Sequence, residues 1–129
     1  MDDREFVAAF EDCSLPPSLF THRQHVRLAW LYLREESLLG ALTRFAEGLK
    51  RYATSLGASA KYHETITWAF LFVIHERMRG ESTFDDFAVA NDDLFSWNAL
   101  MSRYYKSETL ASDRARAAFL MPDVYEVLR

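Results

Sequence analysis

Hydrophobic residues recur along this chain at the three-to-four-residue spacing of amphipathic helices, and no segment alternates convincingly as a strand does. The spacing predicts six or seven helices. They are expected at about residues 2–12, 21–35, 37–56, 59–79, a short segment from 83, 91–105, and a last helix that starts at Ser107 or Ser112 and stops before Pro122. We therefore predict an all-α fold, a compact helical bundle in one domain that covers residues 1–129.

Capping signals mark several of the expected helix ends. Thr21 followed by Gln24 matches a capping box, which makes His22 the first residue of its helix. Thr83 marks the start of the short fifth helix in the same way, and Gly57 is the expected left-handed stop of the third.

The segment from about Ser59 to Arg79 is expected to form the centre of the bundle. From Ile66 to Ile74 apolar residues face every direction around the helix axis, and a helix that is apolar all round is buried all round. Charged residues return only near its two ends. The other helices should wrap around it.

Composition narrows the class of protein. Half of the 129 residues are hydrophobic and ten are Phe, which is enough apolar surface for one core. The net charge is −4 and the charges are interspersed, so we expect no nucleic-acid partner. The single Cys13 excludes an intramolecular disulfide framework and a multi-cysteine zinc or iron–sulfur site.

The chain also lacks the pattern of a targeting or membrane-spanning segment. Its start is not a basic region followed by a long apolar run, and the longest apolar stretch, Trp68 to Ile74, is far too short to cross a bilayer. We expect a soluble cytoplasmic protein with no membrane partner.

The candidate chemistry lies in the histidines. His22 and His25 are three residues apart at a helix start, and a projection at 100° per residue places both on the apolar face of Val26 and Ala29, away from Arg23. Two rings at this spacing can meet one ion, and the helix dipole disfavours the imidazolium form in the first turn. Both effects favour a neutral imidazole that binds metal or accepts a proton.

His63 lies at the start of the apolar fourth helix. If this helix start adjoins that of the second helix, His22, His25 and His63 converge, and three protein ligands with an open position are typical of a catalytic metal site. Imidazole ligands suit Zn, Cu, Fe or Ni. Glu64 could be a fourth ligand, a hydrogen-bond partner of a ligand, or a base. His75, near a helix end, is expected to be solvated.

Two alternatives to a metal site stay open for these histidines. They could act as general acid and base without a metal, or they could be structural, each capping a backbone group or bonding a hydroxyl group. Several signatures of known sites are absent: H-E-x-x-H, the E-x-x-H pattern of di-iron bundles, a His-Asp dipeptide, a Gly-rich phosphate loop and a nucleophile elbow.

The last third of the chain offers further polar candidates. Tyr104 and Tyr105 lie near an expected helix end, and Arg114 and Arg116 lie in the last helix. Arginines in such positions are most often surface residues, although one of these two could hold a substrate carboxylate in a bidentate manner.

Three segments together resemble a group of small uncharacterised bacterial proteins. They are Phe20 to Trp30 (F-T-H-R-Q-H-V-R-L-A-W), Tyr62 to Thr67 (Y-H-E-T-I-T), and Tyr104-Tyr105 through Ser112, Ala115, Arg116, Phe119, Pro122 and Asp123. The resemblance covers most of the chain and implies a coherent helical fold, but no activity. Three-histidine helical bundles of the DinB type are a looser analogy, because their histidine spacing differs.

These observations predict a small-molecule enzyme, of specialised metabolism, with a three-histidine site between helix N-termini that is either metal-dependent or an acid–base site. The alternative is a non-catalytic helical module that binds a ligand or a partner and uses its histidines structurally. In that case Trp30, Leu31 and Trp97 are candidates for an exposed surface that forms a homodimer or binds another protein.

Overall fold

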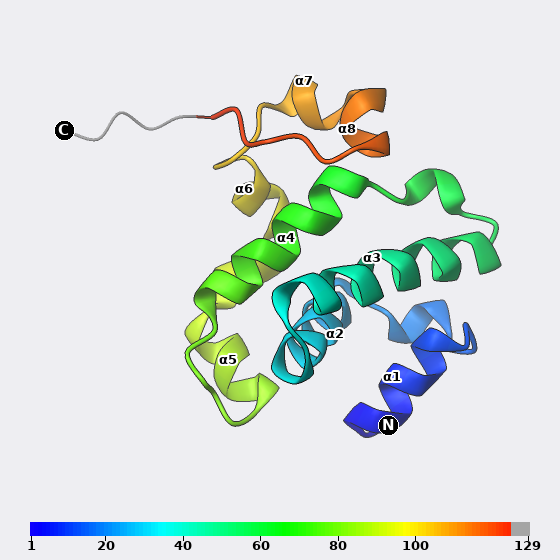
Figure 1. Ribbon diagram of the computed structural model, residues 1–129. Helices are drawn as coiled ribbons and strands as arrows, with labels where there is room; N and C mark the ends of the chain where they lie inside the picture. The colour runs from blue at the N-terminus through cyan, green and yellow to red at the C-terminus, as the bar shows by residue number, and fades with distance from the viewer. Residues whose placement is uncertain (125–129) are drawn as a thin grey trace.

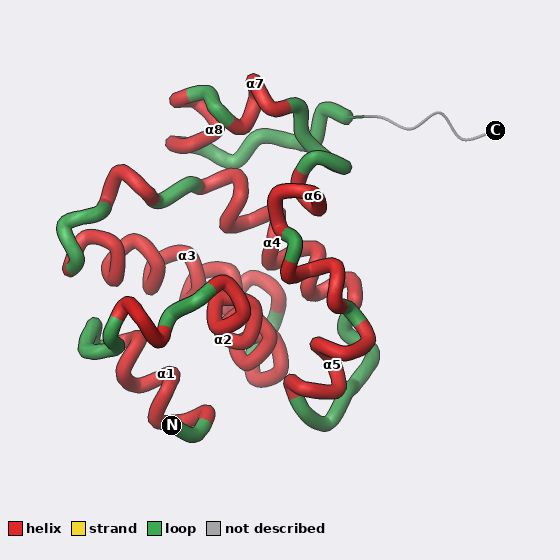
Figure 2. Tube along the Cα trace, turned by 180° about the vertical axis from the view of Figure 1, so that it is seen from behind, coloured by secondary structure: helices red, strands yellow, loops and turns green. Residues whose placement is uncertain are grey.

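Helices and short turns make up the part of the chain that the computed structural model describes, residues 1–124, and this part contains no strand (Figures 1 and 2). The prediction of an all-α fold is confirmed. The elements are α1 (Asp3–Glu11), η1 (Pro17–Leu19), α2 (His22–Glu35), α3 (Leu38–Ser55), η2 (Ser59–Lys61), α4 (Glu64–Arg77), α5 (Phe84–Ala90), η3 (Asp92–Phe95), α6 (Trp97–Met101), α7 (Ser107–Leu110) and α8 (Asp113–Ala117), where η denotes a 3₁₀ helix.

Helix α4 lies between two groups of helices. It packs against α2 and α3 on one side and against α8 on the other, while α1 packs on α3 and α5 on α2 (Figure 1). Half of its 14 residues are buried, including Leu71 and Ile74, which are fully enclosed. The expectation that the apolar fourth helix lies inside the bundle is therefore correct. Helix α2 shares the core with it, because every residue from Leu28 to Leu33 is also buried.

The fourth helix is shorter than the sequence pattern predicts. The expected helix over 59–79 is divided into the turn η2, an extended connection at Tyr62 and His63, and α4 itself, which starts at Glu64. Gly57, at φ 68°, ends α3 in the left-handed conformation as predicted, and the chain needs η2 and the extended residues to reverse direction into α4. At the other end, Met78 is extended and stops the helix.

Trp30 and Leu31 are not surface residues, so the prediction that they form a contact surface is wrong. They are 1% and 8% exposed. The Trp30 ring lies against Phe84 and Phe87 of α5, and the Arg34 guanidinium covers it at 4.6 Å from the ring centroid. Helix α5 therefore occupies the face of α2 that the isolated helix would leave open.

The expected helix over 91–105 is also interrupted. It consists of η3 and α6 with a break at Ser96. Arg77 of α4 bonds both carboxylate oxygens of Asp93 at 2.6 and 2.8 Å, which fixes η3 against α4. The sequence suggests Asn91 as the cap of the next helix. Its side chain instead donates to the Phe87 carbonyl and makes no capping bond.

Hydroxyl side chains cap the starts of three helices, among them those predicted at Thr83 and Ser112, while the capping box predicted at Thr21 is wrong. Ser37, Thr83 and Ser112 each accept a hydrogen bond from the backbone N–H three residues later, at the starts of α3, α5 and α8. Helix α2 begins at His22 as expected, but the Thr21 side chain makes no capping bond. Gln24 accepts from Arg27 at 3.0 Å and does not complete a capping box.

The segment after α8 is held against α4 by one buried threonine. Thr65 Oγ1 donates to the Ala118 carbonyl at 2.8 Å and accepts from the Leu120 N–H at 3.1 Å. The Tyr105 hydroxyl donates to the Leu120 carbonyl at 2.8 Å, and Asp123 accepts from the Lys106 N–H at 2.9 Å. These bonds position α7 and α8 over the start of α4.

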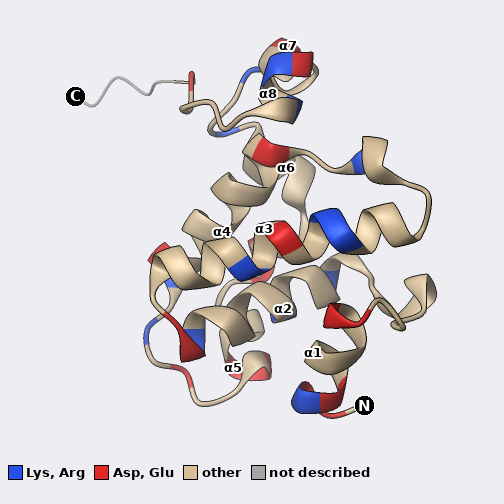
Figure 3. Cartoon of the chain, turned by 45° about the vertical axis from the view of Figure 1, so that its right-hand side comes forward, with Lys and Arg blue, Asp and Glu red and all other residues tan. Residues whose placement is uncertain are grey.

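Charged residues of both signs are spread over the helices (Figure 3). Among residues 1–124, no helix combines the length and the apolar character that crossing a membrane requires.

Candidate functional site

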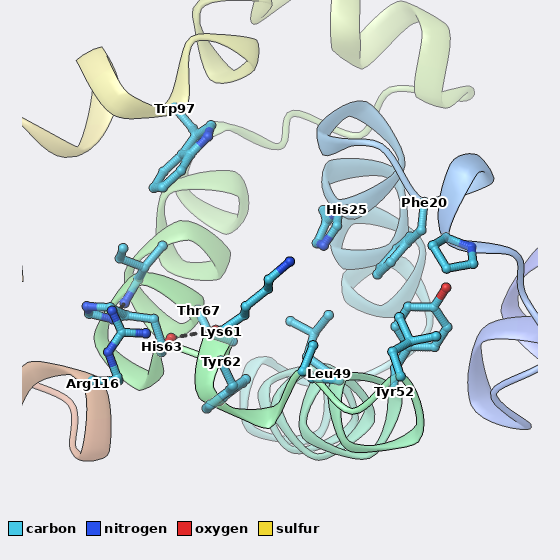
Figure 4. Close-up of a pocket in the computed structure, with 15 residues that line it drawn as sticks. Phe20, His25, Leu49, Tyr52, Lys61, Tyr62, His63, Thr67, Trp97 and Arg116 are labelled. Atoms are coloured by element: carbon cyan, nitrogen blue, oxygen red, sulfur yellow. Dashed lines mark hydrogen bonds between the residues drawn. The ribbon is translucent and has the colours of Figure 1, made fainter. Parts of the chain in front are cut away.

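A cavity of about 560 Å³ opens where the starts of α2 and α4 face the end of α3 (Figure 4). Its apolar lining comes from Pro17, Phe20, Leu49, Tyr52, Ala53, Leu56, Ala58, Ile66 and Trp97, and its polar lining from His25, Lys61, Tyr62, His63, Thr67 and Arg116. A concave, largely apolar space with a few polar groups is the usual form of a small-molecule site, and this volume lies in the usual range. We call it the histidine cavity.

His63 is the N-cap residue of α4 and uses both ring nitrogens. Nδ1 accepts the Ile66 N–H at 3.1 Å, and Nε2 lies 2.7 Å from the Leu110 carbonyl oxygen. A carbonyl can only accept, so Nε2 must carry the proton and the ring is the neutral Nε2–H tautomer. The ring lines the cavity but is committed to structural bonds that join α4 to α7.

His25 has one ring nitrogen available. Its Nδ1–H donates to the Thr21 carbonyl at 2.8 Å, one turn back along α2, and within residues 1–124 no hydrogen bond reaches Nε2. The ring stacks on Phe20, with centroids 3.8 Å apart and planes 17° apart. Burial lowers the pKa of His25 below its ordinary value of 6.5; the bond to Thr21 opposes this effect, and the nearby His22 adds to it. His25 is therefore neutral at neutral pH and has a lone pair at Nε2.

His22 lies outside the histidine cavity. Its Nε2 donates to the Leu94 carbonyl at 2.9 Å, which joins the start of α2 to η3. The ring meets Phe70 edge-on at 5.3 Å between centroids and lies 6.2 Å from the Trp97 ring. Trp97 itself lines the cavity, so His22 supports the wall rather than facing the space.

The three histidines are thus near one another but do not converge. His25 and His63 line the same cavity, as predicted, and His22 does not. Within residues 1–124 no three His, Cys, Asp or Glu side chains are grouped so that they could hold one metal ion. The predicted metal site at His22, His25 and His63 stays a prediction, and the hydrogen bonds of His22 and His63 do not favour it.

Glu64 does not line the histidine cavity. Its Oε1 accepts from the Tyr62 hydroxyl at 2.6 Å and from the Trp68 indole N–H at 3.0 Å, and Lys50 lies 3.5 Å from Oε2. Burial, followed by the Glu64 carboxylate, raises the pKa of Tyr62. These partners do not favour a role for Glu64 as a base beside His63, and that role stays a prediction.

Two cations at the cavity complete the site. The Arg116 guanidinium donates to the Ala60 carbonyl at 2.8 Å, which places it beside η2, and the next residue, Lys61, extends into the cavity (Figure 4). Arg116 was a weak sequence candidate, and Lys61 was missed. No local signal marks Lys61, because its position depends on the chain reversal between α3 and α4.

The other polar candidates of the last third lie elsewhere. Tyr104 and Tyr105 do not line the histidine cavity, and burial, followed by Asp123, raises the pKa of Tyr105 to about 12. Arg114 is exposed and outside the cavity lining, and His75 is exposed as expected.

Comparison of the chain with protein-family models, with curated proteins and with solved structures finds no match. The site must therefore be interpreted from its own chemistry. It offers an apolar space, one neutral imidazole with a basic lone pair, and two cations at its wall. Such a set can bind a small organic molecule and accept a proton from it.

Proposed function

We propose that the protein is a small-molecule enzyme that transfers protons in the histidine cavity, with His25 as the general base. The observation that carries the proposal is the state of the His25 ring. Its Nδ1–H is fixed on the Thr21 carbonyl, and its Nε2 is unbonded among residues 1–124 at the wall of a largely apolar cavity. An oriented neutral imidazole of this kind is the commonest general base in enzymes.

The surroundings of His25 suit this role. Stacking on Phe20 limits rotation of the ring, and the bond to Thr21 selects the tautomer, much as a carboxylate or a carbonyl does for other catalytic histidines. The lowered pKa keeps the base in its proton-accepting form down to slightly acidic pH. The reaction class that follows is removal of a proton from carbon, as in an isomerase, a cyclase or a lyase.

The proposed step is a simple proton exchange. Nε2 of His25 takes a proton from an acidic C–H of the substrate, the electron pair moves into the adjacent carbonyl, and the imidazolium returns a proton to the same or another carbon. His63 holds the helix start in place and takes no part in the transfer.

A metal-dependent form of the reaction would require the histidine side chains to rearrange. His63 uses both ring nitrogens, so it would have to release the Leu110 carbonyl or the Ile66 N–H, and His22, which does not line the cavity, would have to move before Zn, Cu, Fe or Ni could use the three rings together. The acid–base form requires no such rearrangement, and for that reason we favour it.

The second candidate is a non-catalytic ligand-binding module with structural histidines. It is favoured by His22 and His63, because both rings donate to backbone carbonyls of distant segments. The two candidates share the cavity and differ only in whether His25 Nε2 exchanges protons with the bound molecule.

Hydrogen–deuterium exchange at carbon separates the two. The protein is incubated in D₂O with aryl ketones, both neutral and carboxylate-bearing, and loss of the C–H signal next to the carbonyl is followed by proton NMR. We expect wild-type protein to accelerate exchange of at least one compound and His25→Gln to lose at least about a hundredfold of that rate. His75→Gln is the matched control, since His75 is exposed and outside the cavity.

A compound that binds without enhanced exchange would contradict the enzyme proposal and favour the ligand-binding module. Equal exchange by wild type and His25→Gln would contradict the role of His25. Melting temperatures of all variants show whether a lost rate reflects a lost fold.

A further inference from the structure

The charges that line the histidine cavity are of one sign, in contrast with the chain as a whole. The net charge of the protein is −4, yet Lys61 and Arg116 are the charged lining residues and no Asp or Glu lines the cavity within residues 1–124. A low-dielectric wall with charges of one sign concentrates ligands of the opposite sign. The cavity is therefore positive on an acidic protein.

Both Lys61 and Arg116 have N–H donors that no partner within residues 1–124 uses. Among residues 1–124 neither Lys61 nor Arg116 forms an ion pair. Arg116 uses one guanidinium nitrogen on the Ala60 carbonyl, which orients the group and leaves further N–H donors. No hydrogen bond of the Lys61 ammonium within this part of the chain competes for it.

The carboxylate of Glu64 does not cancel the positive charge of the histidine cavity. Glu64 lines an adjoining, smaller cavity together with Arg116 and Tyr62. Its carboxylate accepts from Tyr62 and Trp68 and pairs with Lys50, and within residues 1–124 it forms no ion pair with Arg116.

The positions of the two cations relative to the apolar lining set the shape of a ligand. Lys61 and Arg116 are both fixed to η2, while the aromatic rings of Phe20, Tyr52 and Trp97 line other parts of the cavity (Figure 4). His25 lies on the α2 side, stacked on Phe20. The Lys61 ammonium extends across the space toward His25, whereas Arg116 lies on the opposite side, beside His63 (Figure 4). A molecule that fills the space would meet the Lys61 ammonium, would have Arg116 at its edge, and would meet aromatic or aliphatic side chains along its body.

We propose that the ligand of the histidine cavity is an organic carboxylate with an aromatic or branched apolar body. Lys61 pairs with its carboxylate, Arg116 adds positive charge at the edge of the cavity, and the body lies against the apolar lining beside His25. This inference rests on the proposed function for its choice of cavity and adds the substrate class. The mainly apolar lining favours one small anionic group on an apolar molecule over a heavily charged phosphate compound.

Matched ligands that differ only in charge test this proposal. Binding of 3-phenylpropanoate, 3-phenylpropanamide and 3-phenylpropyl phosphate to the intact protein is measured by NMR titration at low salt. We expect the carboxylate to bind at least about tenfold more tightly than the neutral amide. Because both cations are partly solvated, Lys61→Gln and Arg116→Gln should each weaken carboxylate binding by about three- to tenfold. The amide should bind all forms equally.

Two exposed cations outside the cavity lining supply control variants, and one of them lies on α8 together with Arg116. Arg114→Gln removes a cation two residues before Arg116 on α8, and Lys106→Gln removes an exposed cation, both outside the cavity lining. These variants should bind the carboxylate as wild type does. The conservative Lys61→Arg should keep the preference for the acid over the amide.

Any of four results would overturn the inference. One is equal affinity for acid and amide, and another is an equal loss of affinity in the control variants. Tighter binding of the phosphate monoester than of the carboxylate would assign the cavity to phosphates instead. None of these results touches the proton-transfer role of His25, which the deuterium exchange tests with neutral ketones. Failure of both acid and amide to bind at millimolar concentration also overturns the carboxylate assignment.

Discussion

His63 and Leu110 join the two halves of the site, because the imidazole Nε2–H of His63 donates to the Leu110 carbonyl at 2.7 Å across 47 positions of sequence. The same ring caps α4 through the Ile66 N–H. One side chain thus starts the central helix and holds α7 against it. The cavity keeps its shape because this histidine is structural.

The first prediction follows from these two bonds. His63→Ala removes both and leaves two backbone groups without a partner, so the free energy of unfolding should fall by about 2–3 kcal/mol. His63→Asn should lose less, about 1 kcal/mol, because Asn is a good N-cap for the Ile66 N–H but does not reach Leu110. Urea unfolding measures both. Both variants lack the bond to Leu110, so equal stabilities would show that the cap on the Ile66 N–H contributes nothing. A His63→Asn variant as stable as wild type would show that the bond to Leu110 contributes nothing.

The second prediction concerns pH. The pKa of His25 in the folded protein is lowered below 6.5, mainly by burial, so below about pH 6.5 the unfolded chain binds a proton that the folded chain resists. The resulting stability is fully present above pH 6.5 and is lost as the pH falls from 6.5 toward the folded pKa. His25→Gln should flatten this part of the profile, while His75→Gln should not. NMR titration of the His25 Cε1–H gives the pKa directly, and a value at or above 6.5 would contradict the prediction.

The third prediction concerns the attachment of the segment after α8. Thr65→Val keeps the shape of the side chain but leaves the Ala118 carbonyl and the Leu120 N–H without their partner, which should cost about 1–3 kcal/mol. Thr54→Val is the control, because Thr54 is exposed and bonds only within its own helix. Hydrogen exchange of the Leu120 amide should accelerate in Thr65→Val alone. Unchanged protection of this amide would show that other bonds suffice.

The fourth prediction compares two glycines of α3. A Cβ at Gly48 would lie 2.6 Å from Cε2 of the fully buried Phe10, where α1 crosses α3. Gly48→Ala should therefore destabilise the protein by about 1–3 kcal/mol through overpacking. Gly40→Ala meets only Ser37 and Glu36, at 3.3 Å or more, and gains helix propensity, so its stability should lie within about 1 kcal/mol of wild type. Thermal unfolding of both variants tests the contrast, and a tolerated Gly48→Ala would contradict the close approach.

The sequence by itself determined the fold class and most of the helix ends. Helical spacing of apolar residues and the caps at Ser37, Thr83 and Ser112 are local properties, and so is the left-handed stop at Gly57. The inward direction of His25 also followed from its position on α2, since burial of a helix face depends on its own periodicity.

Only the tertiary structure decided what the histidines do. His22 and His63 donate to the carbonyls of Leu94 and Leu110, which are 72 and 47 positions away in the sequence, so no local pattern could reveal their partners. The hydrophobic pattern also did not predict the short helices of the last third. The bond from Arg77 of α4 to Asp93 sets where η3 lies, and this bond joins two different elements.

Contacts between distant segments also explain why the sequence did not predict the cavity. Lys61 and Arg116 are surface cations in any local interpretation, and they meet at η2 only because α3 reverses into α4 and α8 packs back on it. Periodicity fixes which side of a helix faces inward, whereas the identity of the neighbour depends on long-range packing, and a binding site is made of neighbours.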